Sequence, residues 1–143
     1  MAAGASERFD LARSLPCVYV LFAVAAAGRS AVQLAMHASR APVPYALSAL
    51  AALIYAAGFV ALSRAGRGER ARRAAVALCL VELTGVVAIG CVSVLAPADF
   101  PDDTVWSRFG SGYGYIPAVL PIAALLWLRS EGRERVGLPV PRS

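Results

Sequence analysis

The sequence predicts an all-α fold: a polytopic membrane protein with a four-transmembrane-helix bundle and a short interfacial helix in its last external loop. Of the 143 residues, 59% are hydrophobic and only 16% are charged, a balance unlike that of soluble domains. The apolar residues gather in four stretches, and roughly 20 such residues are enough for a helix to cross a bilayer. Arginines lie in short connections between these stretches, where topology signals are found. We therefore expect one membrane domain over residues 1–143.

The first expected span covers about residues 15–39. Its leading half is apolar, whereas Arg29, Gln33 and His37 make its trailing half polar. A cleaved signal peptide is an open alternative for this segment, because arginines precede an apolar run that ends in the small residues 25–27. Two acidic residues in the leading stretch, and helical amphipathicity that continues beyond the supposed cleavage site, favour a retained span.

The second and third expected spans cover about residues 43–63 and 74–96. The second carries no charge and opens with prolines, which are tolerated in the first turn of a helix. The third is equally long and contains a single charged residue. The fourth span, about residues 113–128, is short and contains Pro117 and Pro121. Because each proline removes a helix hydrogen bond, we expect a kink in the fourth span.

The distribution of arginine predicts the orientation. The connection 64–73 holds five arginines against one glutamate, and the tail 129–143 adds further arginines. Arginine-rich short segments stay on the cytoplasmic side, so both segments are expected there. The loop 97–112 carries three aspartates and one arginine and is therefore expected outside. With four spans, the N- and C-termini are both cytoplasmic in the cell membrane.

A candidate intramembrane polar site comes from the charged residues within the spans. Such residues are costly in lipid, so they mark a pairing or a pathway. Arg29, Gln33 and His37 recur every four residues and form one stripe on the first span. Glu82 lies inside the third span, which runs in the same direction. The sequence leaves open whether Arg29 and Glu82 form an ion pair or whether the stripe lines a wet path.

The external loop supplies a second candidate surface. Asp103 or Thr104 is positioned to cap a short helix at residues 105–109, whose aromatic side chains are expected at the headgroup level. An interfacial anchor is the default interpretation, and a binding surface rich in glycine and tyrosine is the alternative. The acidic residues lack the spacing of a calcium loop, so no metal is expected. This candidate surface comprises Asp99, Asp102, Asp103, Trp106, Tyr113 and Tyr115.

One stretch of the chain carries a family resemblance. At residues 105–107, 109–117 and Pro121, the sequence resembles uncharacterised small four-span integral membrane proteins of GC-rich bacteria. The resemblance covers mainly the last loop and the fourth helix. It implies a bacterial inner-membrane setting and no particular activity.

The sequence contains no catalytic or cofactor motif, and the cysteines lack metal-site spacing. We therefore expect no cofactor, and a non-enzymatic accessory or scaffold subunit of a membrane assembly. The alternative is a small homo-oligomeric transporter or channel that uses Glu82 and the Arg29/Gln33 stripe; a membrane enzyme is a third class. Expected partners are the lipid bilayer and another membrane protein or a second copy. Topology explains the net charge of +5, so no nucleic acid is expected.

Overall fold

The structure is a computed structural model that describes residues 2–37 and 39–137. Within these residues the chain is helical apart from short connections, and no strand is present. This confirms the predicted all-α class. The α-helices are α1 (Ala2–His37), α2 (Pro42–Arg64), α3 (Glu69–Leu95) and α4 (Ile116–Gly137), and the short 3-10 helices are η1 (Ala65–Arg67), η2 (Pro97–Asp99) and η3 (Ser107–Tyr113).

Local sequence explains where α2 and α3 begin. Helix α2 begins with a proline in its first turn and ends at Arg64. After η1, Gly68 adopts a φ of 155°, a value that residues other than glycine rarely adopt. Glu69 then opens α3, where a negative charge favours the helix N-terminus, and it forms ion pairs with Arg72 and Arg73.

Three helical segments are long and apolar enough to span a bilayer, namely Arg13–Met36, Pro42–Arg67 and Glu69–Leu95. A fourth span is present if Ser107–Tyr113 and Ile116–Gly132, which meet at a bend of 97°, are taken together. The apolar part of α4, residues 116–128, is only about 20 Å long, short of the roughly 30 Å of hydrocarbon. The length and apolar character of these helices identify a multi-pass membrane protein.

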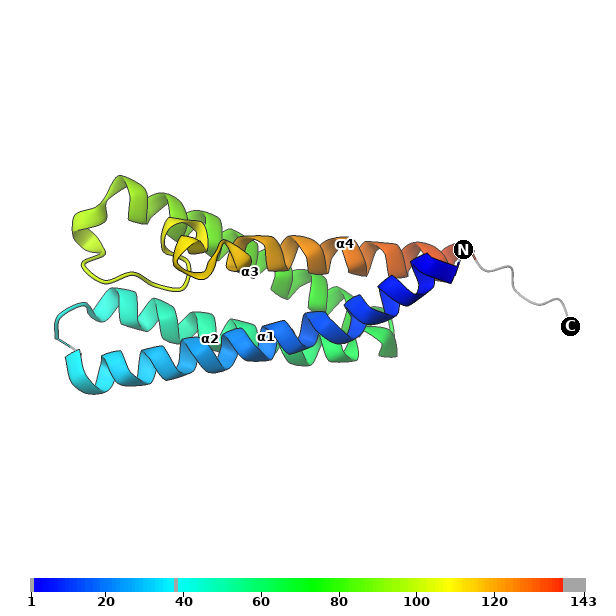
Figure 1. The fold of residues 1–143 in the computed structure, drawn as a ribbon, viewed down its shortest axis with the longest axis horizontal. Coiled ribbons are helices and arrows are strands. Elements are labelled where there is room, and N and C mark those ends of the chain that lie inside the picture. Colours follow the sequence, from blue (N-terminus) through cyan, green and yellow to red (C-terminus); the bar gives the residue numbers. More distant parts are fainter. Residues whose placement is uncertain (1, 38, 138–143) are drawn as a thin grey trace, which may run out of the picture.

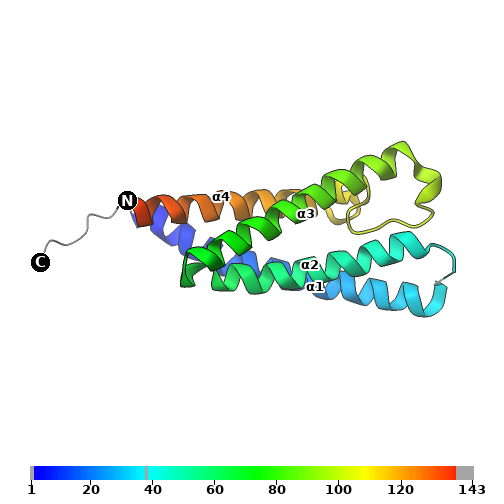
Figure 2. The same ribbon diagram turned by 180° about the vertical axis from the view of Figure 1, so that it is seen from behind.

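The helices form an elongated bundle. Helices α1 and α2 run side by side, and α3 crosses from the end of α2 at one end of the bundle towards α4 (Figures 1 and 2). The start of α1, the α2–α3 turn and the end of α4 share one end (Figure 1). The connections α1–α2 and α3–α4 share the other.

Small residues allow α1 and α2 to approach closely. Gly58 of α2 faces the ring of Tyr19, and a Cβ atom built at Gly58 would lie 2.7 Å from two ring carbons. Ala23 and Ala26 of α1 are buried in the same core as several alanines of α2. Close backbone approach over small residues is the usual way in which membrane helices associate.

The connection between α3 and α4 enters the bundle instead of resting on its surface. Trp106 is only 2% exposed, and its ring lies against Gly85, where an added Cβ would meet it at 2.8 Å. Phe109 lies against Gly90 in the same way, because a Cβ added at Gly90 would lie 2.5 Å from a carbon of its ring. Gly85 is ten residues from the end of α3 at Leu95, so the indole reaches about 15 Å along that helix. These rings, expected from the sequence to rest on the surface as an interfacial anchor, instead pack against α3 within the bundle.

The loop backbone turns sharply to make this insertion. Arg108 and Phe109 adopt φ values of 49° and 60°, and Gly110 follows at 79°. A left-handed conformation at a non-glycine residue is costly and persists only when the surroundings impose it. The short helix expected at residues 105–109 is absent, because Val105 and Trp106 form a turn and the 3-10 helix η3 begins only at Ser107. Thr104 closes this turn: its Oγ1 accepts from the N–H groups of Trp106 and Ser107.

The two prolines of the fourth span have different roles. Pro117 is the second residue of α4, where its missing N–H costs nothing, so the kink expected there is absent. A bend precedes α4 instead, at Gly114 and Tyr115, both of which have a φ near 60°. Pro121 lies inside α4 and leaves the carbonyl group of Pro117 without its helical donor.

We predict that Gly85→Ala destabilises the protein. The added methyl group would overlap the ring of Trp106, and overpacking of this kind costs about 1–3 kcal/mol. Gly28→Ala is the matched control, because nothing lies within 4 Å of its Cβ position and alanine favours a helix. Apparent Tm in detergent measures both variants. Equal Tm values would show that Trp106 is not held against Gly85.

Candidate functional site in the bundle interior

The intramembrane carboxyl group of Glu82 is buried at the middle of α3. It is 1% exposed and lies thirteen residues from each end of that helix, which places it about 20 Å from both. The hydroxyl of Tyr19 donates a hydrogen bond of 2.6 Å to Oε2 of Glu82. Oε1 is also buried, and it has no hydrogen-bond partner among the described residues.

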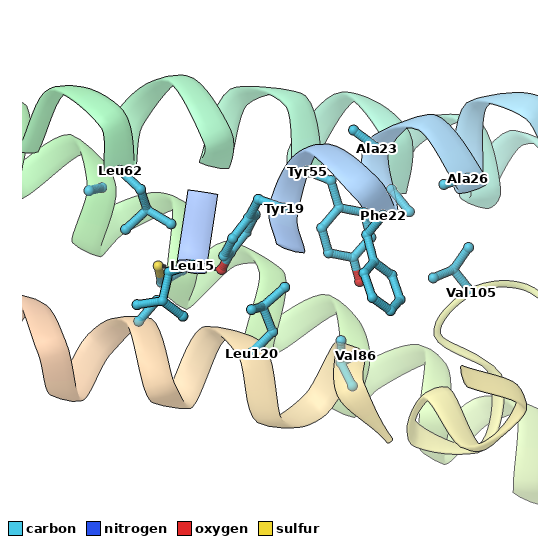
Figure 3. Packing of buried hydrophobic residues seen from close by; sticks show 14 of the residues in the cluster. Leu15, Tyr19, Phe22, Ala23, Ala26, Tyr55, Leu62, Val86, Val105 and Leu120 are labelled. Atoms are coloured by element: carbon cyan, nitrogen blue, oxygen red, sulfur yellow. Dashed lines mark hydrogen bonds between the residues drawn. The ribbon is translucent and has the colours of Figure 1, made fainter. Parts of the chain in front are cut away.

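Side chains from three segments surround this carboxyl group. Tyr19 and Tyr55 come from α1 and α2, and their ring centroids are 6.0 Å apart (Figure 3). The indole N–H of Trp106 donates to the Tyr55 hydroxyl at 3.1 Å, which links the external loop to the cluster. The thiol of Cys79, one turn from Glu82 on α3, lies 3.7 Å from the Tyr19 hydroxyl. We call these five residues, Tyr19, Tyr55, Cys79, Glu82 and Trp106, the buried cluster.

Arg29 and Glu82 do not form an ion pair, so the hypothesis of a pair is not supported. Helix α1 passes Glu82 at the level of Tyr19, and Arg29 lies ten residues further along the same helix. That separation is about 15 Å along the axis of α1. The guanidinium of Arg29 instead donates to the Tyr113 hydroxyl at 3.1 Å and to the backbone carbonyl of Asp103 at 2.5 Å.

Gln33 of the predicted polar stripe does not bind Glu82 either. It is half-buried, and its Oε1 has no hydrogen-bond partner within the described part of the chain. Residue 37 closes α1, and the side chain of His37 lies outside the described residues. Of the predicted intramembrane polar site, Arg29, Gln33 and Glu82 are thus not brought together.

The candidate external surface is divided by the structure. Asp102 accepts a hydrogen bond from Tyr45 of α2, whereas Asp103 pairs with Arg108 at 3.4 Å. Asp99 is exposed in η2. Asp102 and Asp103 therefore bind different neighbours, and among the described residues the three aspartates do not gather into one metal-binding group.

The aromatic members of that surface are divided as well. Tyr113 is half-buried, bonded to Arg29 and packed edge-on against Phe22. Trp106 belongs to the buried cluster, and Tyr115 alone projects outward, at 56% exposure. Tyr113 and Trp106, which were expected on a binding surface, are therefore engaged in contacts within the protein.

The contacts of the loop reach three helices. Arg29 holds it to α1, Tyr45 and Tyr55 hold it to α2, and the Oγ of Ser93 on α3 accepts from the N–H of Arg108 at 2.8 Å. Backbone that is not helical needs hydrogen-bond partners inside a membrane protein. Two of these bonds satisfy loop backbone groups, namely the carbonyl of Asp103 and the N–H of Arg108.

The tyrosines were missed by the sequence analysis. Tyr19, Tyr45 and Tyr55 are each at most 1% exposed, and all three donate or accept hydrogen bonds that join different helices or the loop. A usable signal was present, because a tyrosine inside an apolar span carries a hydroxyl that needs a partner. Which partner each hydroxyl finds depends on the packing of the helices.

The cluster can act chemically in two ways. Hydroxyl donors and a carboxyl acceptor can fasten three segments to one another in the low dielectric of the interior. A carboxyl group with one unpartnered oxygen can also exchange a proton with a neighbouring donor. Among the described residues, no cation lies within ion-pair distance of Glu82.

Comparisons of the chain with protein-family models, with curated proteins and with solved structures find no match. We therefore infer function from the contacts within this chain.

Tyr19→Phe is predicted to lower stability by about 1 kcal/mol. The change removes only the hydroxyl that donates to Glu82, and it leaves the buried carboxyl group without its donor. Tyr115→Phe, on the exposed tyrosine, is the control and should be neutral. Reversible unfolding in mixed micelles measures both. A neutral Tyr19→Phe would contradict a stabilising role for this hydrogen bond.

We also predict that Arg29→Gln loosens the external loop. Loss of the bonds to Tyr113 and to the Asp103 carbonyl should raise hydrogen exchange at residues 103–114 by about tenfold. Arg40→Gln, on an exposed arginine of the α1–α2 connection, should leave that exchange unchanged. Mass spectrometry of exchanged peptides reports both. An equal rise in the two variants would point to a general charge effect.

Proposed function

We propose that this chain is a non-enzymatic accessory or scaffold subunit of a membrane assembly. The observation that carries the proposal is that polar side chains inside the bundle form hydrogen bonds from one segment to another. Glu82, Arg29 and Trp106 each hydrogen-bond to a segment other than their own, so the polar groups serve to hold the bundle together. A bundle fastened from within presents a rigid, apolar outer face to lipid and to other membrane proteins.

The outer surface supports this role. Large apolar side chains project from every long helix, including Val24 at 67%, Leu53 at 69%, Val94 at 55% and Leu126 at 61% exposure. Van der Waals packing of such faces drives the association of membrane helices. The described connections outside the helices are short, which leaves little soluble mass for an activity of its own.

The proposed setting is a bacterial inner membrane, with both termini in the cytoplasm. Clustering of arginines at the end of the bundle that holds the α2–α3 turn supports this orientation. In a background in which the exposed Cys17 and Cys91 are replaced by alanine, Arg67→Cys should be labelled by a membrane-impermeant maleimide only after the cells are opened, whereas Asp99→Cys should be labelled in intact cells. The reverse pattern would invert the proposed topology.

A second candidate function is a small homo-oligomeric transporter or channel. The unpartnered Oε1 of Glu82 favours it, because a buried carboxyl oxygen without a donor is a place where a proton or another ligand can bind. In such a protein the buried cluster would be the proton-exchanging site, and Arg29 and Gln33 would lie nearer the external end of the path.

Native mass spectrometry of the protein, extracted gently from its own membrane, tests the scaffold proposal. A subunit should appear in a heteromeric complex of fixed stoichiometry. A stable homo-oligomer without other chains would instead favour the transporter.

Glu82→Gln separates the two functions further. Glutamine keeps the size and one acceptor oxygen, so a scaffold should keep its stability and its copurifying partners nearly unchanged. A transporter should lose proton-linked flux in proteoliposomes while still folding. Glu131→Gln, on the cytoplasmic part of α4, is the control for removal of a carboxyl group. Flux that survives Glu82→Gln would remove the case for the transporter.

A further inference from the structure

A groove lies between α2 and α3 at the arginine-rich end of the bundle. Its volume is about 580 Å³, within the range of about 300–1,000 Å³ that is typical of small-molecule sites. The walls are almost entirely apolar and are formed mainly by small side chains, among them Ala57, Ala61 and Ala74, with Val60 and Leu78.

The position of the groove places it in lipid. Its walls belong to the two helices that flank the α2–α3 turn, and both helices qualify as membrane spans. Ala57 lies seven residues before Arg64, so the apolar part extends about 10 Å from the turn towards the bilayer centre. A groove of this depth accommodates the part of a lipid acyl chain that lies nearest the headgroup.

The mouth of the groove is positively charged. Arg64, the last residue of α2, forms part of its lining. Arg67 and Arg70 follow within two turns and are exposed. Within the described part of the chain, no carboxylate pairs with these three arginines, because Glu69 is engaged by Arg72 and Arg73. An apolar trough that ends at unneutralised guanidinium groups is complementary to a molecule with an aliphatic chain and an anionic head.

The dimensions favour a lipid over a protein helix. The lining covers only residues 56–64 of α2 and 71–78 of α3, about two turns of each helix. A docked transmembrane helix would need a longer seam and acidic residues opposite the arginines. A lipid supplies both a narrow chain and a phosphate in one molecule, and basic pockets between membrane helices bind anionic headgroups in this way.

We propose that this groove is a binding site for one anionic phospholipid, with an acyl chain between α2 and α3 and its phosphate at Arg64. The guanidinium of Arg64 donates to the phosphate oxygens, and the neighbouring Arg67 and Arg70 add attraction at longer range. The site is separate from the buried cluster, which faces the inside of the bundle, so it holds whichever function Glu82 serves.

The test uses the full chain, delipidated in a neutral detergent and titrated with phosphatidylglycerol or with phosphatidylcholine of the same acyl chains. Native mass spectrometry counts the bound lipids. The wild type should retain one phosphatidylglycerol at least about fivefold more tightly than phosphatidylcholine, the selectivity expected of one well-placed arginine. Arg64→Gln should abolish that selectivity. Its matched control, Arg129→Gln, changes an exposed arginine of α4 at the same end of the bundle and should preserve it.

A second pair of variants tests the acyl-chain groove. Ala61→Leu fills the groove and should weaken binding of both lipids, whereas Ala88→Leu, on an exposed face of α3 outside it, should not. Helical circular dichroism and a monodisperse elution profile establish that each variant is folded. Equal losses of selectivity in Arg64→Gln and Arg129→Gln would overturn the proposal in favour of diffuse surface attraction. Loss of a copurifying protein chain in Ala61→Leu, with lipid binding intact, would overturn it in favour of a protein partner.

Discussion

The hydrogen bond from Tyr19 to Glu82 is the interaction around which the interior of this bundle is organised. A carboxyl group at the middle of a membrane helix must find its partners within the protein, because the surrounding lipid offers none. Tyr19 supplies one from α1, and its ring fits against Gly58 of α2, so one side chain sets the spacing of three helices. The polar and the apolar parts of the tyrosine act together here. The ring provides packing, and the hydroxyl fixes the level at which α1 passes α3.

The α3–α4 connection completes the bundle where the fourth helix is too short. Helix α4 begins only at Ile116, and the inserted segment that contains Trp106 and Phe109 fills the space between its start and the C-terminal end of α3. Left-handed backbone at Arg108 and Phe109 is the cost of that path, and bonds to Arg29, Tyr55 and Ser93 offset it. Gly85 and Gly90 of α3 leave the space into which the rings of Trp106 and Phe109 pack, so the path of the loop depends on both glycines.

The interior of the bundle and its outer surface carry different kinds of side chain. Polar side chains join segments in the interior, while alanine, valine and leucine cover the face towards lipid. The arginine-rich turn is the exception, because Arg64, Arg67 and Arg70 pair with no carboxylate in the part of the chain that the structure describes. Both proposals follow from this separation. A rigid apolar exterior suits a scaffold, and an unneutralised cationic rim beside an apolar groove suits an anionic lipid.

The sequence by itself determined the helical class and the membrane setting, and it singled out Glu82 as the charged residue inside the third span, because apolar length and the cost of a charge in lipid are properties of local composition. It also offered Asp103 or Thr104 as a helix cap, and Thr104 does bind nearby backbone N–H groups, but it closes a turn where a helix was expected. Only the tertiary structure decided that Tyr19 and not Arg29 meets Glu82, that Trp106 enters the bundle, and that Asp102 and Asp103 bind different partners. Those outcomes depend on the relative level and crossing of helices that are far apart in the chain. Neither quantity is encoded in the spacing of residues along any one of them.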